Sequence, residues 1–236
     1  MILPGATVVS VIAGPPYVTD DPEPVAYRHW EVYLSSQWSR SGTTVAGTAP
    51  AIEANYGLLP EVQLSCMAQL AVCTSTDGRN DYGPGDMELG IKYRFLQESA
   101  GVPQISIYPS VEVPATVYAK GRGSDGSPVF IPLWIQKSSG PWTTFCGGGY
   151  QATIGQRSKN FWLFGWEGQR DLSPVLTVGA ELFTVSAHDG YQGTEIGFNA
   201  GAAFNVSEHH HVLASIGRDV VGMNQFTSYL AYQLTI

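Results

Sequence analysis

The sequence contains few charged residues, and basic residues are the scarcest of them. Lys, Arg, Asp and Glu make up 14% of the 236 residues, whereas a soluble domain usually has about 25%. The 12 basic residues are outnumbered by 20 acidic ones, which gives a net charge of −8, and the basic residues form no cluster in the sequence. Nucleic-acid binding needs a basic patch, so this class of function is excluded. Disorder is excluded as well, because 44% of the residues are hydrophobic and 11% are aromatic.

Cysteine is also scarce. The three cysteines are Cys66, Cys73 and Cys146, an odd number without a CxxC spacing. We therefore expect neither a disulfide framework nor a zinc site.

Long hydrophobic runs are absent. No stretch reaches the roughly 18 apolar residues of a membrane-spanning helix. Residues 2–14 (ILPGATVVSVIAG) are apolar but short, and Pro4 and Gly5 interrupt them. They are a candidate for the remnant of a signal peptide. We divide the chain into an N-terminal segment, residues 1–24, on the periplasmic side, and a single domain, residues 25–236.

Alternation of apolar and polar residues is the dominant pattern. In residues 87–95 the apolar set interleaves with Glu88, Gly90, Lys92 and Arg94, as in a strand with one apolar and one polar face. Strands of this length, about 9 to 11 residues, can cross a bilayer at a tilt. We predict twelve strands, near 29–38, 50–57, 62–72, 86–96, 104–114, 128–137, 142–152, 160–170, 175–186, 194–205, 210–217 and 225–236.

The connections between these strands alternate in length. Short turns are expected at 58–61, 97–103, 138–141, 171–174 and 206–209. Longer loops are expected at 39–49, 73–85, 115–127, 153–159, 187–193 and 218–224. Short periplasmic turns and longer extracellular loops are typical of outer-membrane barrels. The predicted fold is therefore all-β, an antiparallel transmembrane β-barrel of about 12 strands.

The polar face of the strands is rich in carboxylates, and in a membrane barrel this face lines the lumen. Acidic rings favour cations in a pore. An alternative is a closed lumen in which these side chains tie the strands together. We expect Tyr33 and Tyr108 to offer stacking faces to an aromatic solute. The candidate lumen and selectivity residues are Glu31, Glu53, Glu88, Lys92, Arg94, Glu112, Glu167, Glu181, Glu195, Tyr33 and Tyr108.

Aromatic residues gather at one predicted end of the strands. Such rings form the girdle of a membrane barrel at headgroup level; the alternative is a soluble aromatic core. The last strand is apolar at every second position up to Ile236, although a terminal aromatic is usual. The predicted girdle comprises Trp30, Tyr56, Tyr93, Phe95, Trp142, Trp166 and Phe204.

With these residues identified, the chain resembles the bacterial outer-membrane β-barrel family associated with the MetA pathway of phenol degradation, whose members are described as transporters. The resemblance implies passage of small, aromatic or hydrophobic compounds across the outer membrane. The stretches that carry it are GPPYVTDDPEPV (14–25), HWEVYL (29–34), NYGLLPEVQL (55–64), PGDMELGIKYRFLQE (84–98), PLWIQKSSGPWTTFCGGGY (132–150), FWLFGWEGQRDLSP (161–174) and NVSEHHHVLASIGRD (205–219).

Two weaker patterns could bind a metal. His209, His210 and His211 adjoin a short turn, but adjacent strand residues point to opposite faces, so at most two could converge. Residues 76–81 (TDGRND) offer oxygen ligands without the terminal Glu of a calcium loop. We expect a polar rim and a solvated loop, respectively, with no metal and no cofactor.

Catalysis is the other alternative, since some membrane barrels hydrolyse lipids with a Ser and a His. Ser215 lies four residues after His211, and His188 precedes Asp189. Neither arrangement gives a nucleophile with a base and an orienting group. We expect no enzyme.

The combined interpretation is a passive channel for small solutes in the outer membrane of a Gram-negative bacterium. Its partners would be the lipid bilayer, small-molecule solutes and the outer-membrane assembly machinery, with no nucleic acid. The alternatives are a soluble or secreted β-barrel or sandwich that binds a ligand, and an outer-membrane barrel with a lipid-hydrolase or structural role.

Overall fold

The computed structural model describes residues 15–74, 80–114, 127–154, 160–187 and 193–236, and their regular structure is entirely β. None of the described segments forms a helix long and apolar enough to span a membrane. The strands are β1 (Trp30–Ser41), β2 (Thr44–Leu59), β3 (Val62–Thr74), β4 (Asn80–Pro84), β5 (Met87–Leu96), β6 (Gln104–Ile107), β7 (Ser110–Val113), β8 (Ser127–Ser139), β9 (Trp142–Ile154), β10 (Phe161–Ser173), β11 (Leu176–Ala187), β12 (Glu195–Asn205), β13 (His210–Val221) and β14 (Phe226–Thr235).

Two pairs of these segments each form one interrupted strand. Gly85 and Asp86 separate β4 from β5, and both segments pair with β3. Tyr108 and Pro109 separate β6 from β7, and both segments pair with β5 and with β8. The proline has no N–H for the ladder, which accounts for the second interruption. The 14 segments therefore make twelve strands, as the alternation predicted.

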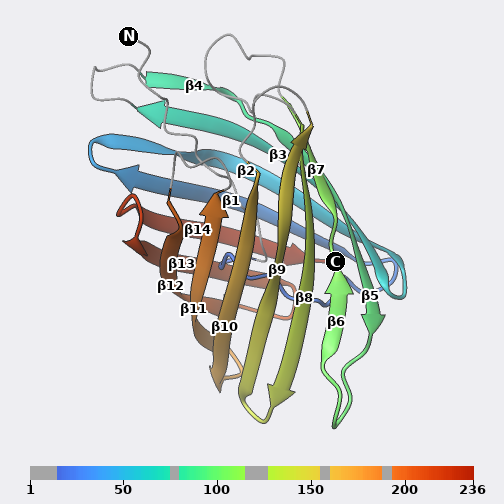
Figure 1. Ribbon diagram of the computed structural model, residues 1–236. Helices are drawn as coiled ribbons and strands as arrows, with labels where there is room; N and C mark the ends of the chain where they lie inside the picture. The colour runs from blue at the N-terminus through green and yellow to red at the C-terminus, as the bar shows by residue number, and fades with distance from the viewer. Residues whose placement is uncertain (1–14, 75–79, 115–126, 155–159, 188–192) are drawn as a thin grey trace.

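The sheet closes on itself. Every strand pairs antiparallel with its neighbours in the chain, and β1 pairs with β14 from Glu31↔Thr235 to Arg40↔Phe226. Figure 1 shows the strands following one another around the barrel in chain order. Closure removes the sheet edges, which could otherwise pair with another chain. The predicted antiparallel barrel is confirmed.

The connections differ between the two ends of the barrel. The short-turn end carries the connections at 60–61, 97–103, 140–141, 174–175 and 206–209. The opposite end, the long-loop end, carries the connection between β1 and β2 and those that contain residues 75–79, 115–126, 155–159 and 188–192. Three loops predicted at this end are too long. Within 73–85, residues 80–84 form strand β4. Residues 39–49 are mostly strand, because Gly42, with φ of 59°, allows a tight hairpin. The connection predicted at 218–224 is 222–225, because β13 continues to Val221.

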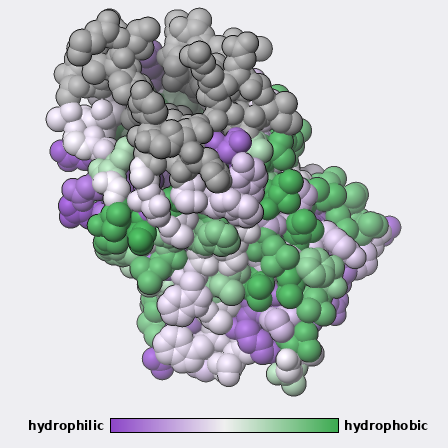
Figure 2. Space-filling view, in the orientation of Figure 1, coloured by the Kyte–Doolittle hydropathy of each residue, from purple (hydrophilic) through white to green (hydrophobic). Residues whose placement is uncertain are grey.

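The side chains alternate sharply between the two faces of the wall. On β10 and β11, Glu167 and Glu181 are each 2% exposed, whereas Trp166 and Leu182 are 57% and 52% exposed. Figure 2 shows hydrophobic residues gathered over the outside of the barrel. A soluble barrel would bury its apolar face, so that alternative is excluded. Other exposed apolar residues of this belt are Leu34, Ile52, Leu64, Ile91, Ile131, Phe164, Ile216 and Leu230.

Aromatic residues line the outside of the short-turn end, as predicted. The Trp30 and Tyr56 rings pack with centroids 4.6 Å apart, and Tyr93 and Phe95 are neighbours at the end of β5. Trp166 is an exception because it lies near the middle of β10. Tyr150 and Trp162, towards the long-loop end, pack with their rings tilted by 47° and their centroids 5.0 Å apart. Aromatic side chains therefore occur towards both ends of the apolar belt.

Candidate functional site

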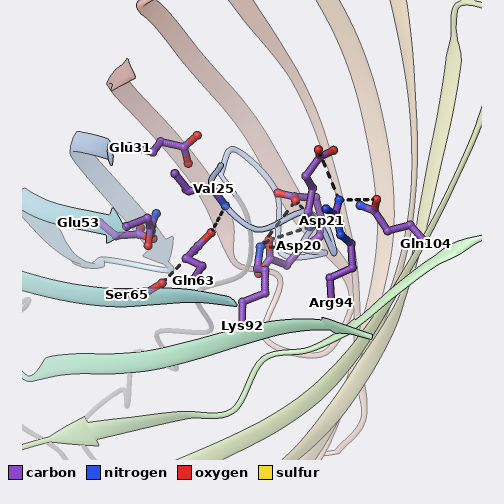
Figure 3. A network of polar contacts seen from close by, with 12 residues as sticks. Asp20, Asp21, Val25, Glu31, Glu53, Gln63, Ser65, Lys92, Arg94 and Gln104 are labelled. Carbon is purple, nitrogen blue, oxygen red and sulfur yellow. Dashed lines mark hydrogen bonds and ion pairs between the residues drawn. The ribbon is translucent and has the colours of Figure 1, made fainter. Parts of the chain in front are cut away.

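The lumen contains part of the chain itself. Residues 15–25, the lumen segment, run through the barrel interior from a contact with β13 at Pro16 to a contact with β3 at Val25 (Figures 1 and 3). The segment is rich in proline and aspartate, which fit poorly in a strand ladder. Its backbone polar groups therefore need partners other than a sheet, and the wall supplies them.

One attachment lies on β11 and its neighbours. The Glu181 carboxylate accepts hydrogen bonds from the backbone N–H groups of Val18, at 2.6 Å, and Thr19, at 2.8 Å. The Asn199 amide donates to the same carboxylate at 2.5 Å. Ser215 donates its hydroxyl to the Pro16 carbonyl, also at 2.5 Å. Bonds to a charged acceptor are stronger than neutral ones, so Glu181 is the main anchor on this wall.

Glycines on the same wall make room for the segment. A Cβ atom at Gly179 would lie 2.6 Å from the Tyr17 hydroxyl, and one at Gly165 would lie 2.1 Å from Thr19 Oγ1. At Gly201 the Tyr17 hydroxyl would be 3.0 Å away. These glycines allow close approach between the segment and the wall.

A second attachment lies on β5. Lys92 Nζ is 3.3 Å from Asp20 Oδ1 and donates to the Asp21 carbonyl at 2.8 Å. Arg94 lies 3.6 Å from Glu23 and donates to Gln104 at 2.9 Å. Figure 3 shows these groups converging on the segment from the wall. Lys92 and Asp20 are 5% and 3% exposed, so each charge depends on its partner for compensation.

Arg94 also reaches the turn between β2 and β3. Its Nε is 2.6 Å from Glu61 Oε2, and Gln97 donates to the other oxygen at 2.5 Å. The hydrogen bond from Arg94 holds the pKa of the Glu61 carboxyl below its usual value. The short-turn rim is therefore clamped to the same strand that holds the segment.

The space left beside the segment forms two cavities. The larger, of about 600 Å³, opens near His29, Trp30 and His209 at the short-turn end. The smaller, of about 80 Å³, lies on the other side of Pro15. Pro15 and Glu53 line both cavities. Residues of β14, β1 and β2 contribute to the lining of both cavities, and Pro15 and Glu53 lie between the two.

The predicted lumen residues fall into separate groups. Glu31, Glu53, Tyr33, Tyr108 and Lys92 line the larger cavity. Glu167 and Glu181 face each other on β10 and β11, where the segment is attached. Glu88 and Glu112 face each other on β5 and β7, away from both cavities. Glu195 is the first residue of β12, at the long-loop end.

The two predicted aromatic faces are only partly free. Tyr33 is 7% exposed and donates its hydroxyl to Glu31 at 2.6 Å. The Tyr108 ring lies over Gly90, with Lys92 Nζ 5.1 Å from its centroid. Both rings are held by the wall and still border the larger cavity.

Sequence reasoning missed the position of the lumen segment and the anchoring role of Glu181. It gave no role to the inward glycines of β10 to β12, whereas Gly165, Gly179 and Gly201 make room for the segment. Two sequence features together could have indicated its position: a Pro- and Asp-rich stretch at residues 19–24, and strands that carry glycine on their inner face.

The candidate metal and catalytic residues have other partners. His210 bonds the Tyr232 hydroxyl, and His211 Nδ1 lies 2.8 Å from Asn205 Oδ1. No group of three or more His, Cys, Asp or Glu side chains suited to a metal occurs among the described residues. Ser215 points inward, away from the lipid-facing surface that a lipid hydrolase would use. His188 lies outside the described residues, as does most of 76–81.

Comparisons with known proteins agree with this architecture. The profile of a family described as "Putative MetA-pathway of phenol degradation" matches residues 32–234. No curated protein sequence matches the chain.

Among solved structures, an outer membrane channel from Pseudomonas putida F1 has a TM-score of 0.76 at 15% identity, covering 92% of this chain and 98% of that one. NanC porin has a TM-score of 0.63 at 6% identity, with 86% and 98% covered. KdgM porin has a TM-score of 0.61 at 11% identity, also with 86% and 98% covered. These likenesses establish the fold of an outer-membrane barrel.

Proposed function

We propose, on the premise that the chain belongs to the MetA-pathway phenol-degradation family, that it is an outer-membrane channel for the passive passage of small solutes. The channel would use no cofactor and no covalent chemistry. The family and the resemblance of the fold to an outer membrane channel and two porins support this proposal.

The observation that carries the proposal is the pair of cavities meeting at Pro15 and Glu53. A solute in the larger cavity would have to pass between Pro15 and Glu53 to reach the smaller one. Such a route suits small molecules and disfavours wide hydrophilic ones. It also suits solutes with an aromatic or hydrophobic part, because Tyr33, Tyr108 and Leu213 border the larger cavity.

We infer a preference for cations along this route. Glu31, Glu53, Asp20, Asp21, Glu23 and Glu208 line the larger cavity, and among the described residues Lys92 is the one Lys or Arg that lines it with them. Acidic groups around a narrow passage attract cations and repel anions. Glu88, Arg94, Glu112, Glu167, Glu181 and Glu195 would act less directly, through the field of the lumen.

The proposed setting is the outer membrane of a Gram-negative bacterium, with the short-turn end in the periplasm. The N-terminal segment, residues 1–24, would then enter from the periplasmic side, with its residues 15–24 in the lumen. The apolar belt would contact the bilayer, and insertion would depend on the outer-membrane assembly machinery.

Single-channel recording in a planar bilayer with a salt gradient tests the proposal. We expect small discrete current steps with a reversal potential biased towards cations. Glu53→Gln should reduce this bias most, and Glu112→Gln, away from both cavities, should reduce it less. Absence of current from protein that is folded in the bilayer would contradict an open passage.

A further inference from the structure

The wall beside the larger cavity gathers hydrogen-bond acceptors. Glu31 on β1 lies opposite Asn55 on β2, and Tyr33 lies opposite Glu53, so all four share the inward face of one strand pair. Glu31, Glu53 and Asn55 all line the cavity. In Figure 3, the Glu31 and Glu53 side chains lie apart from Lys92, with Val25 and Gln63 between them.

The wall does not supply enough donors for these acceptors. Glu31 accepts from the Tyr33 hydroxyl at 2.6 Å and has the Gln233 side chain as a second partner. Glu53 accepts from Asn55 Nδ2 at 2.9 Å. Within the described part of the chain, neither carboxylate forms an ion pair. The neighbouring cation, Lys92, is engaged with Asp20 and Asp21.

Asn55 gives an independent sign of a missing partner. Its side chain is 3% exposed, and its Oδ1 atom has no hydrogen-bond partner. A buried acceptor that lacks a donor costs about 1–3 kcal/mol. Its nitrogen is already used by Glu53, and its oxygen is buried at the edge of the cavity, so a donor in the cavity would reach this atom after a small movement of the side chain.

We propose that Glu31, Glu53 and Asn55 form a binding site for the ammonium group of a small amine-bearing solute. An ammonium group carries three donors and no acceptor, which matches two carboxylates and one amide oxygen. Tyr33, Leu213 and Ala203 border the same cavity and would contact the apolar part of the solute. A hard metal ion such as Ca²⁺ takes about 6–8 oxygen ligands, more than this site offers, so an organic cation fits better than a metal ion.

The site deepens the proposed function, since a solute has to reach the cavity, but binding is measurable without passage. The full chain is folded in detergent and titrated calorimetrically with benzylamine, which is cationic at neutral pH, and with benzyl alcohol, which has a similar shape and no charge. Ionic strength is kept constant, so that general screening is the same in both titrations.

We expect benzylamine to bind and benzyl alcohol to bind at least about tenfold more weakly, as befits loss of a charge-assisted contact. Glu53→Gln and Asn55→Leu should each weaken benzylamine binding several-fold. Asp171→Asn removes a carboxylate at the exposed short-turn rim, outside the cavity, and should leave the affinity unchanged.

Equal affinities for the two compounds would overturn the proposal, as would an affinity that Glu53→Gln and Asn55→Leu both leave intact. If Glu53→Gln does not fold, Glu31→Gln takes its place with the same expected loss. Liposome permeation is measured separately. Binding without permeation would contradict the channel and support the binding site. Permeation without amine binding would support the channel and contradict the binding site.

Discussion

The two sides of the lumen differ in what lies against them. On the side of β10 to β13 the wall receives the lumen segment, and its inward residues there include Gly165, Gly179 and Gly201. On the side of β14, β1 and β2 the wall borders empty space, and its inward residues are larger and polar, among them Tyr33, Glu53 and Asn55. The comparison teaches that the inward face is shaped by what lies against it: glycines where the lumen segment approaches the wall closely, and larger polar side chains where the wall borders the cavities.

The attachments differ in chemistry as well as in shape. Glu181 holds the segment through two backbone N–H groups, whereas Lys92 holds it through a buried ion pair with Asp20. A hydrogen bond to a charged group contributes about 1.5–3 kcal/mol. Removal of one partner from a buried ion pair costs about 3–5 kcal/mol, because the other charge is left uncompensated.

Removal of the lumen segment should abolish the difference between the two sides and have the largest effect. Deletion of residues 15–24 leaves every described strand pairing in place, and we expect single-channel conductance to rise several-fold. Heat-dependent gel mobility serves as the control for a folded barrel. A folded variant with wild-type conductance would show that the segment does not limit the passage.

Loss of the Lys92 anchor should have the next largest effect. Lys92→Met leaves Asp20 buried without its cation, so we expect this end of the segment to leave the wall. Bilayer recordings should then show higher and more variable conductance. The double variant Lys92→Met, Asp20→Asn removes both charges and should return the recordings towards the wild type. A double variant as variable as the single one would contradict the ion-pair explanation.

A matched pair of glycines sharpens the comparison on the packed side. A Cβ atom at Gly179 would lie 2.6 Å from the Tyr17 hydroxyl, whereas one at Gly168 would meet nothing within 4 Å. Gly179→Ala should lower the free energy of unfolding by about 1–3 kcal/mol, as overpacking does, and Gly168→Ala should leave it nearly unchanged. Urea unfolding in lipid vesicles measures the free energy of unfolding of both variants. Equal effects would contradict a close contact between Tyr17 and the wall at Gly179.

Acid should have the smallest effect, at the rim clamp between Arg94 and Glu61. Because the pKa of Glu61 is lowered in the folded protein, its contribution to stability is present at neutral pH. The contribution is lost as the pH falls below the ordinary glutamate value, about 4.3. Glu61→Gln should therefore lower the unfolding temperature slightly at neutral pH and not in acid. The same loss at both pH values would exclude the clamp.

Much of the fold could be predicted from the sequence, because a two-sided strand leaves a period of two in the chain. Glu167 beside Trp166, and Glu181 beside Leu182, show which residues face inward once the barrel is assumed. Loop lengths were harder to predict. The segment 39–49 contains Gly, Ser and Thr, which suit loops, but strand β1 continues through it to a hairpin at Gly42.

The candidate site could be predicted only in part. Glu31, Glu53 and Lys92 were identified as inward residues. Periodicity shows which face of a strand a residue occupies, but it shows neither how deep in the lumen the side chain lies nor which group it contacts. Whether a carboxylate meets solvent, a backbone N–H or a lysine depends on the path of residues 15–25, which have no repeating pattern. Nothing in the sequence pointed to Asn55, because an amide side chain is common on an inward face. Only the structure shows that its oxygen lacks a hydrogen-bond donor.

The spread of the lumen segment's contacts has a consequence for the order of assembly. Its partners lie on β3, β5 and β10 to β13, so a sheet that lacks any part of this range cannot present them all. The full set of contacts exists only after the strands from β3 to β13 have assembled. Seating of the segment is therefore a late folding step, and a proteolytic cut within residues 15–25 that is blocked once the segment is seated would time the assembly of these strands.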